Sequence, residues 1–182
     1  MELTRRPSFP SQFFIRGYLI DPDKDDQFYV VEALDVRIVD KWFELARDVA
    51  KEKNVPHMWI LAMIYAESRG DPSAEASDGG WGLMQITHPG LKKGYTKAQV
   101  FEPETNIRIG AGVVASYLRA NPEANSLPEA ASIYNAGGTP KYRPHPSEVS
   151  PWGMRETAGH ISRVVAANNG LISFYEAGVC RP

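Results

Sequence analysis

The sequence is poor in cysteine, in long apolar runs and in excess charge of either sign. Its 182 residues include one cysteine, Cys180, so the chain can form neither an internal disulfide nor a zinc site built from two to four cysteines. The formal net charge is −2, from 20 Lys+Arg and 22 Asp+Glu, which argues against nucleic-acid binding through a broad basic field. With 43% hydrophobic and 23% charged residues, the composition is that of a globular protein and excludes a disordered or collagen-like chain.

The sequence also shows no signal for export or membrane insertion. A secretory signal has an apolar core followed by a cleavage site of small residues, and the segment that begins with residues 1–7 has neither. The longest stretch with few polar groups, residues 55–66, is too short to span a bilayer and already contains His57. We therefore expect a soluble protein that is synthesised in the cytoplasm and has no transmembrane segment.

Residues 1–33 differ from the rest and are expected to form an N-terminal arm. Two runs rich in aromatic and β-branched residues, 13–20 and 27–31, flank a Pro/Asp turn, and this pattern predicts a β-hairpin. A two-stranded hairpin is marginal alone, so the arm should pack on the main domain or dock on a partner that the sequence does not identify. Residues 34–182 are expected to form one mainly α domain.

From residue 34 onward the helical period of apolar residues dominates. Asp35 fits the N-cap of a helix over about 36–53, and Pro56 opens a helix that reaches Ser68 and stops at Gly70. That second helix is apolar almost all round, which predicts the central buried helix of the fold. Further helices are predicted at about 82–86, 103–119, 127–136 and 154–168, the last ended by Asn168-Asn169-Gly170. Residues 90–102 are predicted as loop with room for one turn of helix, and residues 139–151 as loop.

Glu67 interrupts the apolar pattern of the predicted central helix. At helical spacing it shares a face with Ile60, Met63 and Ile64, the face that should be buried. A carboxyl group there loses hydration, which raises its pKa and prepares it to act as a general acid near neutral pH. The plainer alternative is a glutamate at a helix end that turns to water or pairs with Arg69.

Two later segments carry polar groups beside glycines. Glycines between positions 79 and 82 let the backbone approach a ligand or the helix end, and Gln85 offers an amide there. Further along, the Tyr134 hydroxyl and the Asn135 amide precede a glycine pair and could orient a carboxylic acid and bind an N-acetyl sugar. Taken singly, Gln85 could equally be a surface residue, and the second segment a helix C-cap beside a core tyrosine.

Taken together, these motifs resemble the lytic transglycosylases and the related goose-type lysozymes. The resemblance covers about residues 40–168 and implies a lysozyme-like helical fold that binds the glycan strands of peptidoglycan. It implies no metal and no organic cofactor, and the four histidines have no ligand-like spacing. The segments that carry it, in the family's order, are Ala66-Glu67-Ser68, Gly82-Leu83-Met84-Gln85-Ile86, residues 101–110 and Tyr134-Asn135-Ala136-Gly137.

The resemblance also implies roles for individual residues. Glu67 would protonate the glycosidic oxygen between N-acetylmuramic acid and N-acetylglucosamine, then act as base on the C6 hydroxyl of the same sugar. The product is a 1,6-anhydromuramic end, and the tethered nucleophile gives an intramolecular advantage. Tyr134, the second catalytic residue, would hold Glu67 in place. The substrate-binding residues would be Ser77, Asp78, Met84, Gln85 and Asn135.

The sequence departs from the transglycosylase pattern just before Gly82. Ser77 is displaced by one residue and an acid-glycine run follows it, which is closer to goose-type lysozymes. There an aspartate can position water for hydrolysis, with the two carboxyl groups roughly 6.5–9.5 Å apart. Asp78 is the candidate for that role, or it is a turn residue that caps Gly80. Thr87, where such lysozymes often place a second aspartate, favours transglycosylation.

Two alternatives therefore accompany the transglycosylase prediction. One is a muramidase that hydrolyses the same bond with water, and the other is an inactive wall-binding or structural module. A wall enzyme without an export signal would reach its substrate through lysis machinery, a particle or a secretion device. A phage lysis protein or virion-associated enzyme fits that description.

Overall fold

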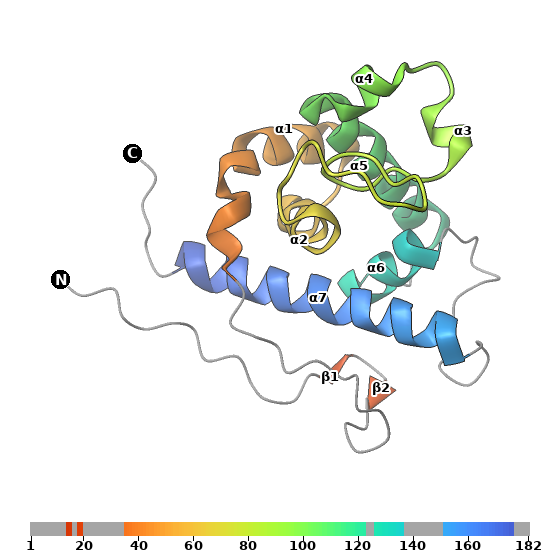
Figure 1. Cartoon of the computed structure of the whole chain (residues 1–182). Helices are drawn as coiled ribbons and strands as arrows, with labels where there is room; N and C mark the ends of the chain where they lie inside the picture. The colour runs from red at the N-terminus through yellow and green to blue at the C-terminus, as the bar shows by residue number, and fades with distance from the viewer. Residues whose placement is uncertain (1–13, 16–17, 20–34, 123–125, 137–150, 177–182) are drawn as a thin grey trace.

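The computed structural model describes residues 14–15, 18–19, 35–122, 126–136 and 151–176, and this part of the chain is mainly helical (Figure 1). None of the described helices combines the length and the apolar character needed to span a membrane. In chain order the elements are β1 (Phe14–Ile15), β2 (Tyr18–Leu19), the 3-10 helix η2 (Val36–Trp42), and the α-helices α1 (Phe43–Lys53), α2 (His57–Ser68), α3 (Pro89–Lys92), α4 (Lys97–Phe101), α5 (Pro103–Ala120), α6 (Leu127–Ala136) and α7 (Pro151–Glu176).

Helix α2 is the buried centre of the fold, as its apolar sequence predicts. Figure 1 shows it end-on, with the other long helices arranged around it, and it packs on η2, α1 and α7. The five consecutive residues 60–64 are fully buried. Because burying a large apolar side chain contributes roughly 1.5–3 kcal/mol, this helix is a major part of the core.

The helix predicted over residues 36–53 is in fact two helices. Asp35 caps the first, as predicted, because its Oδ1 accepts the Arg37 N–H at 3.3 Å. Val36, Val39 and Trp42 are three residues apart, and side chains at that spacing eclipse in a 3-10 helix, so all three point to the core. The chain therefore winds as η2 until Trp42 and continues as α1.

Between α2 and α5 the structure corrects one prediction and adds detail to another. Residues 82–86 form a tight turn closed by the bridge between Trp81 and Ile86 instead of a helix. The segment predicted as loop with one turn of helix contains two short helices. They are α3, which begins at Pro89, and α4, which has a capping box between Thr96 and Gln99. The predicted helices that follow are confirmed as α5 and α6.

Helix α7 continues well past its predicted end. Asn168 and Gly170 were expected to stop it, but the helix runs on to Glu176. Leu171 is fully buried, and α7 packs on both α2 and α6. That packing outweighs the low helix propensity of asparagine and glycine, which totals about 1–2 kcal/mol at these positions.

The described strands lie inside a single predicted run. β1 pairs antiparallel with β2, Phe14 opposite Leu19 and Ile15 opposite Tyr18, so the chain turns back between them. The predicted partner strand at 27–31, and the predicted loop at 139–150, lie outside the described residues. The hairpin arm and its boundary at residue 33 stay predictions.

Candidate active site

Glu67 lies at the C-terminal end of the central helix, with its side chain 16% exposed. The helix ends because Arg69 adopts the left-handed conformation, with φ of 53°. The neighbouring Ser68 hydroxyl donates to the Leu83 carbonyl at 2.8 Å and accepts the Gly70 N–H at 3.2 Å. The helix end that carries Glu67 is thereby tied to residues 71–88, which we call the site loop.

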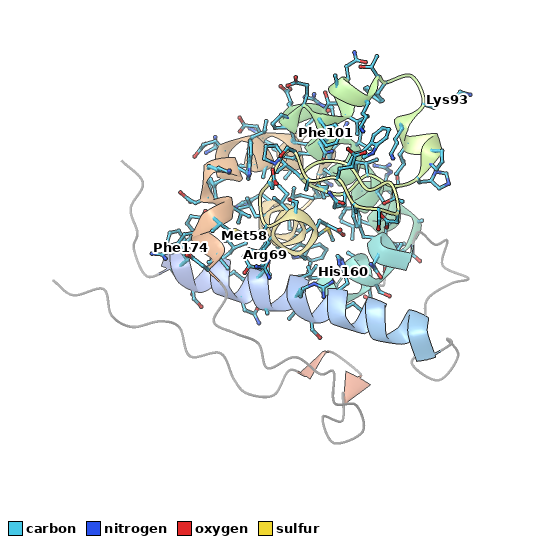
Figure 2. All side chains as sticks on the ribbon, viewed as in Figure 1. Met58, Arg69, Lys93, Phe101, His160 and Phe174 are labelled. Carbon is cyan, nitrogen blue, oxygen red and sulfur yellow. The ribbon has the colours of Figure 1, made fainter. Side chains whose placement is uncertain are left out.

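The imidazole of His160 on α7 lies against the Glu67 carboxyl group. His160 Nδ1 is 3.6 Å from Glu67 Oε1, and the His160 side chain is 2% exposed. Figure 2 labels His160 on the side of α7 that faces α2 and α6. Burial, together with the positive charge of Arg163, lowers the pKa of His160 to about 4. The imidazole is therefore neutral at pH 7, and the contact is not an ion pair.

Tyr134 on α6 is close enough to Glu67 for their charges to interact. Burial first, and then the negative charge of Glu67, raise the pKa of Tyr134 well above its usual value. The Tyr134 hydroxyl donates its proton to the Met84 carbonyl at 2.7 Å. The Tyr134 proton is thus engaged by the site loop, and the role of Tyr134 in holding Glu67 stays a prediction. Asn135, in the last turn of α6, is half-buried.

Met84 anchors the site loop to the core. It is fully buried, and its sulfur packs so closely on α5 that a Cβ at Gly110 would lie 2.4 Å from it. Its backbone N–H donates to Asn106 Oδ1 at 2.8 Å, while its carbonyl accepts from Tyr134. Met84 was predicted to contact substrate, but a fully buried side chain supports the loop from beneath and presents no surface to a ligand.

Asn106 on α5 is the second anchor and was not selected from the sequence. Besides accepting from Met84, its Nδ2 donates to the carbonyls of Trp81 and Val100, both at 2.8 Å. Gly82, with φ of 74°, passes so close that a Cβ there would lie 2.3 Å from Asn106 Nδ2. The signal for Asn106 was a polar residue on the buried face of a helix, the reasoning that selected Glu67. The same signal applies to His160.

Gln85 holds the site loop in shape from within. Its backbone is left-handed, with φ of 47°, and its side chain is half-buried. Gln85 Nε2 donates to the carbonyls of Ala74 at 3.1 Å and Gly82 at 2.8 Å. The amide nitrogen of Gln85, a residue predicted to contact substrate, is therefore engaged inside the loop.

Ser77 and Asp78 lie on the exposed part of the site loop. Asp78 Oδ1 accepts the Gly80 N–H at 3.0 Å, which is the turn-capping arrangement considered as one of its alternatives. Thr87 is exposed as well, and its hydroxyl donates to the Gln85 carbonyl at 3.1 Å.

The outer face of the site loop is fastened to α3 and α4. Lys92 Nζ donates to the Gly79 carbonyl at 2.6 Å and lies 3.5 Å from the centre of the Trp81 ring. Trp81 in turn stacks on Phe101, the ring centres being 6.1 Å apart. Contacts on both sides thus fix the loop before any ligand binds.

The arrangement as a whole suits proton transfer. A carboxyl group largely removed from water lies beside a neutral imidazole and a protonated phenol, all on helices or a braced loop. Within the ranges that the structure describes, no three His, Cys, Asp or Glu side chains come together as a metal site would require. A mainly helical domain with a sheltered glutamate at the end of its central helix agrees with the lysozyme-like fold that the sequence predicts.

Comparison with known proteins specifies the family. Residues 44–148, more than half of the chain, match the transglycosylase SLT domain. The chain belongs to this family of lytic transglycosylases. A comparison with curated protein sequences gives no match.

Three solved structures share the fold. The 70 kDa soluble lytic transglycosylase from Escherichia coli is 23% identical, covers 75% of this chain and 26% of its own, and has a TM-score of 0.60. A 70 kDa soluble lytic transglycosylase in complex with bulgecin A is 24% identical, with a TM-score of 0.63. That match covers 76% of this chain and 25% of the transglycosylase. An inactive Glu-to-Gln variant of Slt from Pseudomonas aeruginosa is 21% identical to this chain, with a TM-score of 0.62. That match covers 86% of this chain and 27% of Slt. The chain thus spans about a quarter of the length of these proteins.

Proposed function

We propose that the chain cleaves the β-1,4 bond between N-acetylmuramic acid and N-acetylglucosamine in peptidoglycan and leaves 1,6-anhydromuramic ends. Family membership supports the class of reaction. The observation that carries the proposal is Glu67, a carboxyl group 16% exposed at the end of the central helix.

In the first step Glu67 acts as general acid. Loss of water around a carboxyl group disfavours its charged form, and a neutral imidazole adds no positive charge that would favour ionisation. Glu67 protonates the glycosidic oxygen, the bond to the muramic C1 breaks, and the N-acetylglucosamine side leaves as an alcohol. The carboxylate that results faces the muramic residue.

In the second step the same carboxylate acts as general base. It takes the proton of the muramic C6 hydroxyl as that oxygen bonds to C1, so Glu67 is protonated again and the 1,6-anhydro ring is closed. Water is not consumed. One carboxyl group suffices because the nucleophile is already attached to the reacting sugar, an effective-concentration advantage that reaches about 10⁵ M or more in well-oriented systems.

The remaining predicted residues support these steps. The Tyr134 hydroxyl donates its proton to the Met84 carbonyl. The phenolic oxygen of Tyr134 can therefore accept a hydrogen bond, and this bond would position the Glu67 O–H. Asn135, Gln85, Ser77 and Asp78 are proposed to contact the glycan, Gln85 through its carbonyl oxygen since its nitrogen binds the loop.

Hydrolysis by the same site is the main alternative. It would need a second carboxylate to position water, and Asp78 is the candidate. The exposed Asp78 side chain is engaged in capping the turn at Gly80, and Thr87 supplies no further acid, so transglycosylation is favoured. Delivery by a phage particle or lysis system remains a hypothesis from the sequence.

The test is a Glu67→Gln variant incubated with purified cell-wall sacculi, with Glu102→Gln as a matched control. Glu102 is exposed and makes no side-chain cap to α5. We expect Glu67→Gln to remain folded and to lose nearly all release of anhydromuropeptides, and Glu102→Gln to match the wild type. The related Slt structure is an inactive Glu-to-Gln variant, which accords with this expectation. Equal release of anhydromuropeptides by all three proteins, or release by none of them, would contradict the proposal.

A further inference from the structure

His160 is a buried polar side chain that the proposed reaction has not used. It is 1% exposed as a residue, and its Nδ1 faces Glu67 Oε1 at 3.6 Å. Its other ring nitrogen, Nε2, is also buried and has no hydrogen-bond partner within the described part of the chain. Burying a polar atom without a partner is unfavourable, so a residue that serves packing alone would be apolar here.

The charged and titratable groups near His160 lie on α2, on α6 and on α7 itself. Helix α2 contributes Glu67, and α7 itself contributes Arg163, whose charge lowers the pKa of His160. Helix α6 contributes the Tyr134 hydroxyl, which is buried and interacts with the charge of Glu67. η2 also packs on α7, but its Asp40 accepts from Tyr175, fifteen residues beyond His160 and therefore about 22 Å along the helix. Of the described carboxyl groups, Glu67 is the one against the His160 ring.

These surroundings determine which nitrogen should carry the proton. A neutral imidazole has one N–H donor and one acceptor nitrogen. A proton on Nε2 would point at no acceptor among the described residues, whereas a proton on Nδ1 points at a carboxyl oxygen. The 3.6 Å separation is longer than a hydrogen bond, and such catalytic contacts often tighten only when substrate is bound.

We propose that His160 is a positioning residue that donates from Nδ1 to Glu67 and stabilises the carboxylate that forms between the two proton transfers. The inference rests on the proposed transglycosylase function. When Glu67 gives its proton to the glycosidic oxygen, the Nδ1–H hydrogen bond strengthens because its acceptor becomes charged. His160 gains and loses no proton during the cycle. It holds Glu67 in orientation and lowers the barrier of the step that leaves Glu67 ionised.

Three variants distinguish a residue that donates a hydrogen bond from Nδ1 from a residue that only fills space in the core. His160→Asn places an amide nitrogen where Nδ1 lies, because both side chains branch at Cγ. His160→Leu has the same branching without a donor, and His160→Gln carries its amide one bond further, toward the position of Nε2. Packing alone would favour leucine, since a buried apolar side chain leaves no polar group unpaired. The proposal predicts the opposite order for activity.

The experiment measures kcat, KM and the pH profile for release of anhydromuropeptides, with chemical denaturation of each variant alongside. We expect kcat of His160→Leu and His160→Gln to fall roughly tenfold or more, the loss that a hydrogen bond to a charged group implies. KM should change little, and the alkaline limb of the profile should move to higher pH because the ionised form of Glu67 loses its donor. His160→Asn should stay near the wild type on kcat and on that limb.

The outcomes distinguish this inference from the proposed function. A wild type that releases no anhydro product defeats the function itself. An active wild type with an unchanged kcat and alkaline limb in His160→Leu, or with equal losses in the leucine and asparagine variants, overturns the role of His160. Nitrogen NMR of the wild type tests the same point without any variant: a proton on Nδ1 is expected, and a proton on Nε2 would overturn the inference.

Discussion

The Tyr134 hydroxyl donates a hydrogen bond of 2.7 Å to the Met84 carbonyl, joining α6 to the site loop. The N–H of the same Met84 donates to Asn106, and its side chain packs on Gly110. Met84 is therefore the point at which the loop, α5 and α6 meet. A carboxyl group on α2 can be held accurately only if the elements around it are fixed, so these contacts matter for the reaction as well as for stability.

Removing the Tyr134 hydroxyl tests that junction. Tyr134→Phe leaves the Met84 carbonyl buried without its donor, which should lower the free energy of unfolding by about 1–3 kcal/mol. Urea denaturation measures it, and Tyr95→Phe is the control, since Tyr95 is 46% exposed. The control should change stability little. Identical unfolding midpoints for both variants would show that the hydrogen bond contributes nothing.

Two glycines in α5 make a matched pair. Gly110→Ala places a methyl group 2.4 Å from the Met84 sulfur, whereas Gly112→Ala meets nothing within 4 Å. Alanine is the better helix former by about 1 kcal/mol, so Gly112→Ala should raise stability. Gly110→Ala should instead lower it by about 1–3 kcal/mol and reduce activity, because the loop must move to make room. Thermal unfolding of both variants decides, and an equal gain in both would mean that the loop is not packed on α5 as described.

Asn106→Asp tests the polar anchor of the loop with almost no change in shape. The Nδ2 group donates to two carbonyls, and an oxygen in its place would face both of them. We expect a loss of about 3–5 kcal/mol, typical of a buried charge without a partner. Asn169→Asp, at an exposed position of α7, is the control. Similar denaturation curves for the two variants would contradict the role given to Asn106.

How far the sequence predicts this structure depends on the kind of signal. The centre of the fold could be predicted because residues 60–64 are apolar on every face, and only a fully buried helix tolerates that. Glu67 could be selected because it is charged on that buried face, and the family motifs place Tyr134 beside it. These inferences need only local spacing and pattern.

The misses come from tertiary packing. Asn168 and Gly170 are buried, and nothing in the sequence near them shows that tertiary packing keeps α7 helical beyond them. The sequence of residues 82–86 predicts a short helix. It forms a turn because Asn106, which is distant in sequence, hydrogen-bonds to the backbone of this segment. Met84 seemed a substrate contact for the same reason, because its burial depends on Gly110 in another helix.

The pH dependence of stability follows from His160. Its pKa is about 4 in the fold against an ordinary value of 6.5, so the unfolded chain binds a proton between these values and the folded chain does not. This contribution to stability is complete above pH 6.5 and is lost as the pH falls toward 4. The loss should amount to roughly 3 kcal/mol. Denaturation of the wild type and His160→Leu as a function of pH measures it, and parallel curves through this window would contradict the burial of a neutral imidazole.

The central claim is that Glu67 serves as acid and then as base while water stays out of the reaction. Mass spectrometry of muropeptides released in water enriched in heavy oxygen tests it most directly. The account predicts muramic ends lighter by one water and without heavy oxygen, and none of these products from Glu67→Gln. Reducing muramic ends that carry heavy oxygen, made by the wild type, would contradict it and assign the site to hydrolysis.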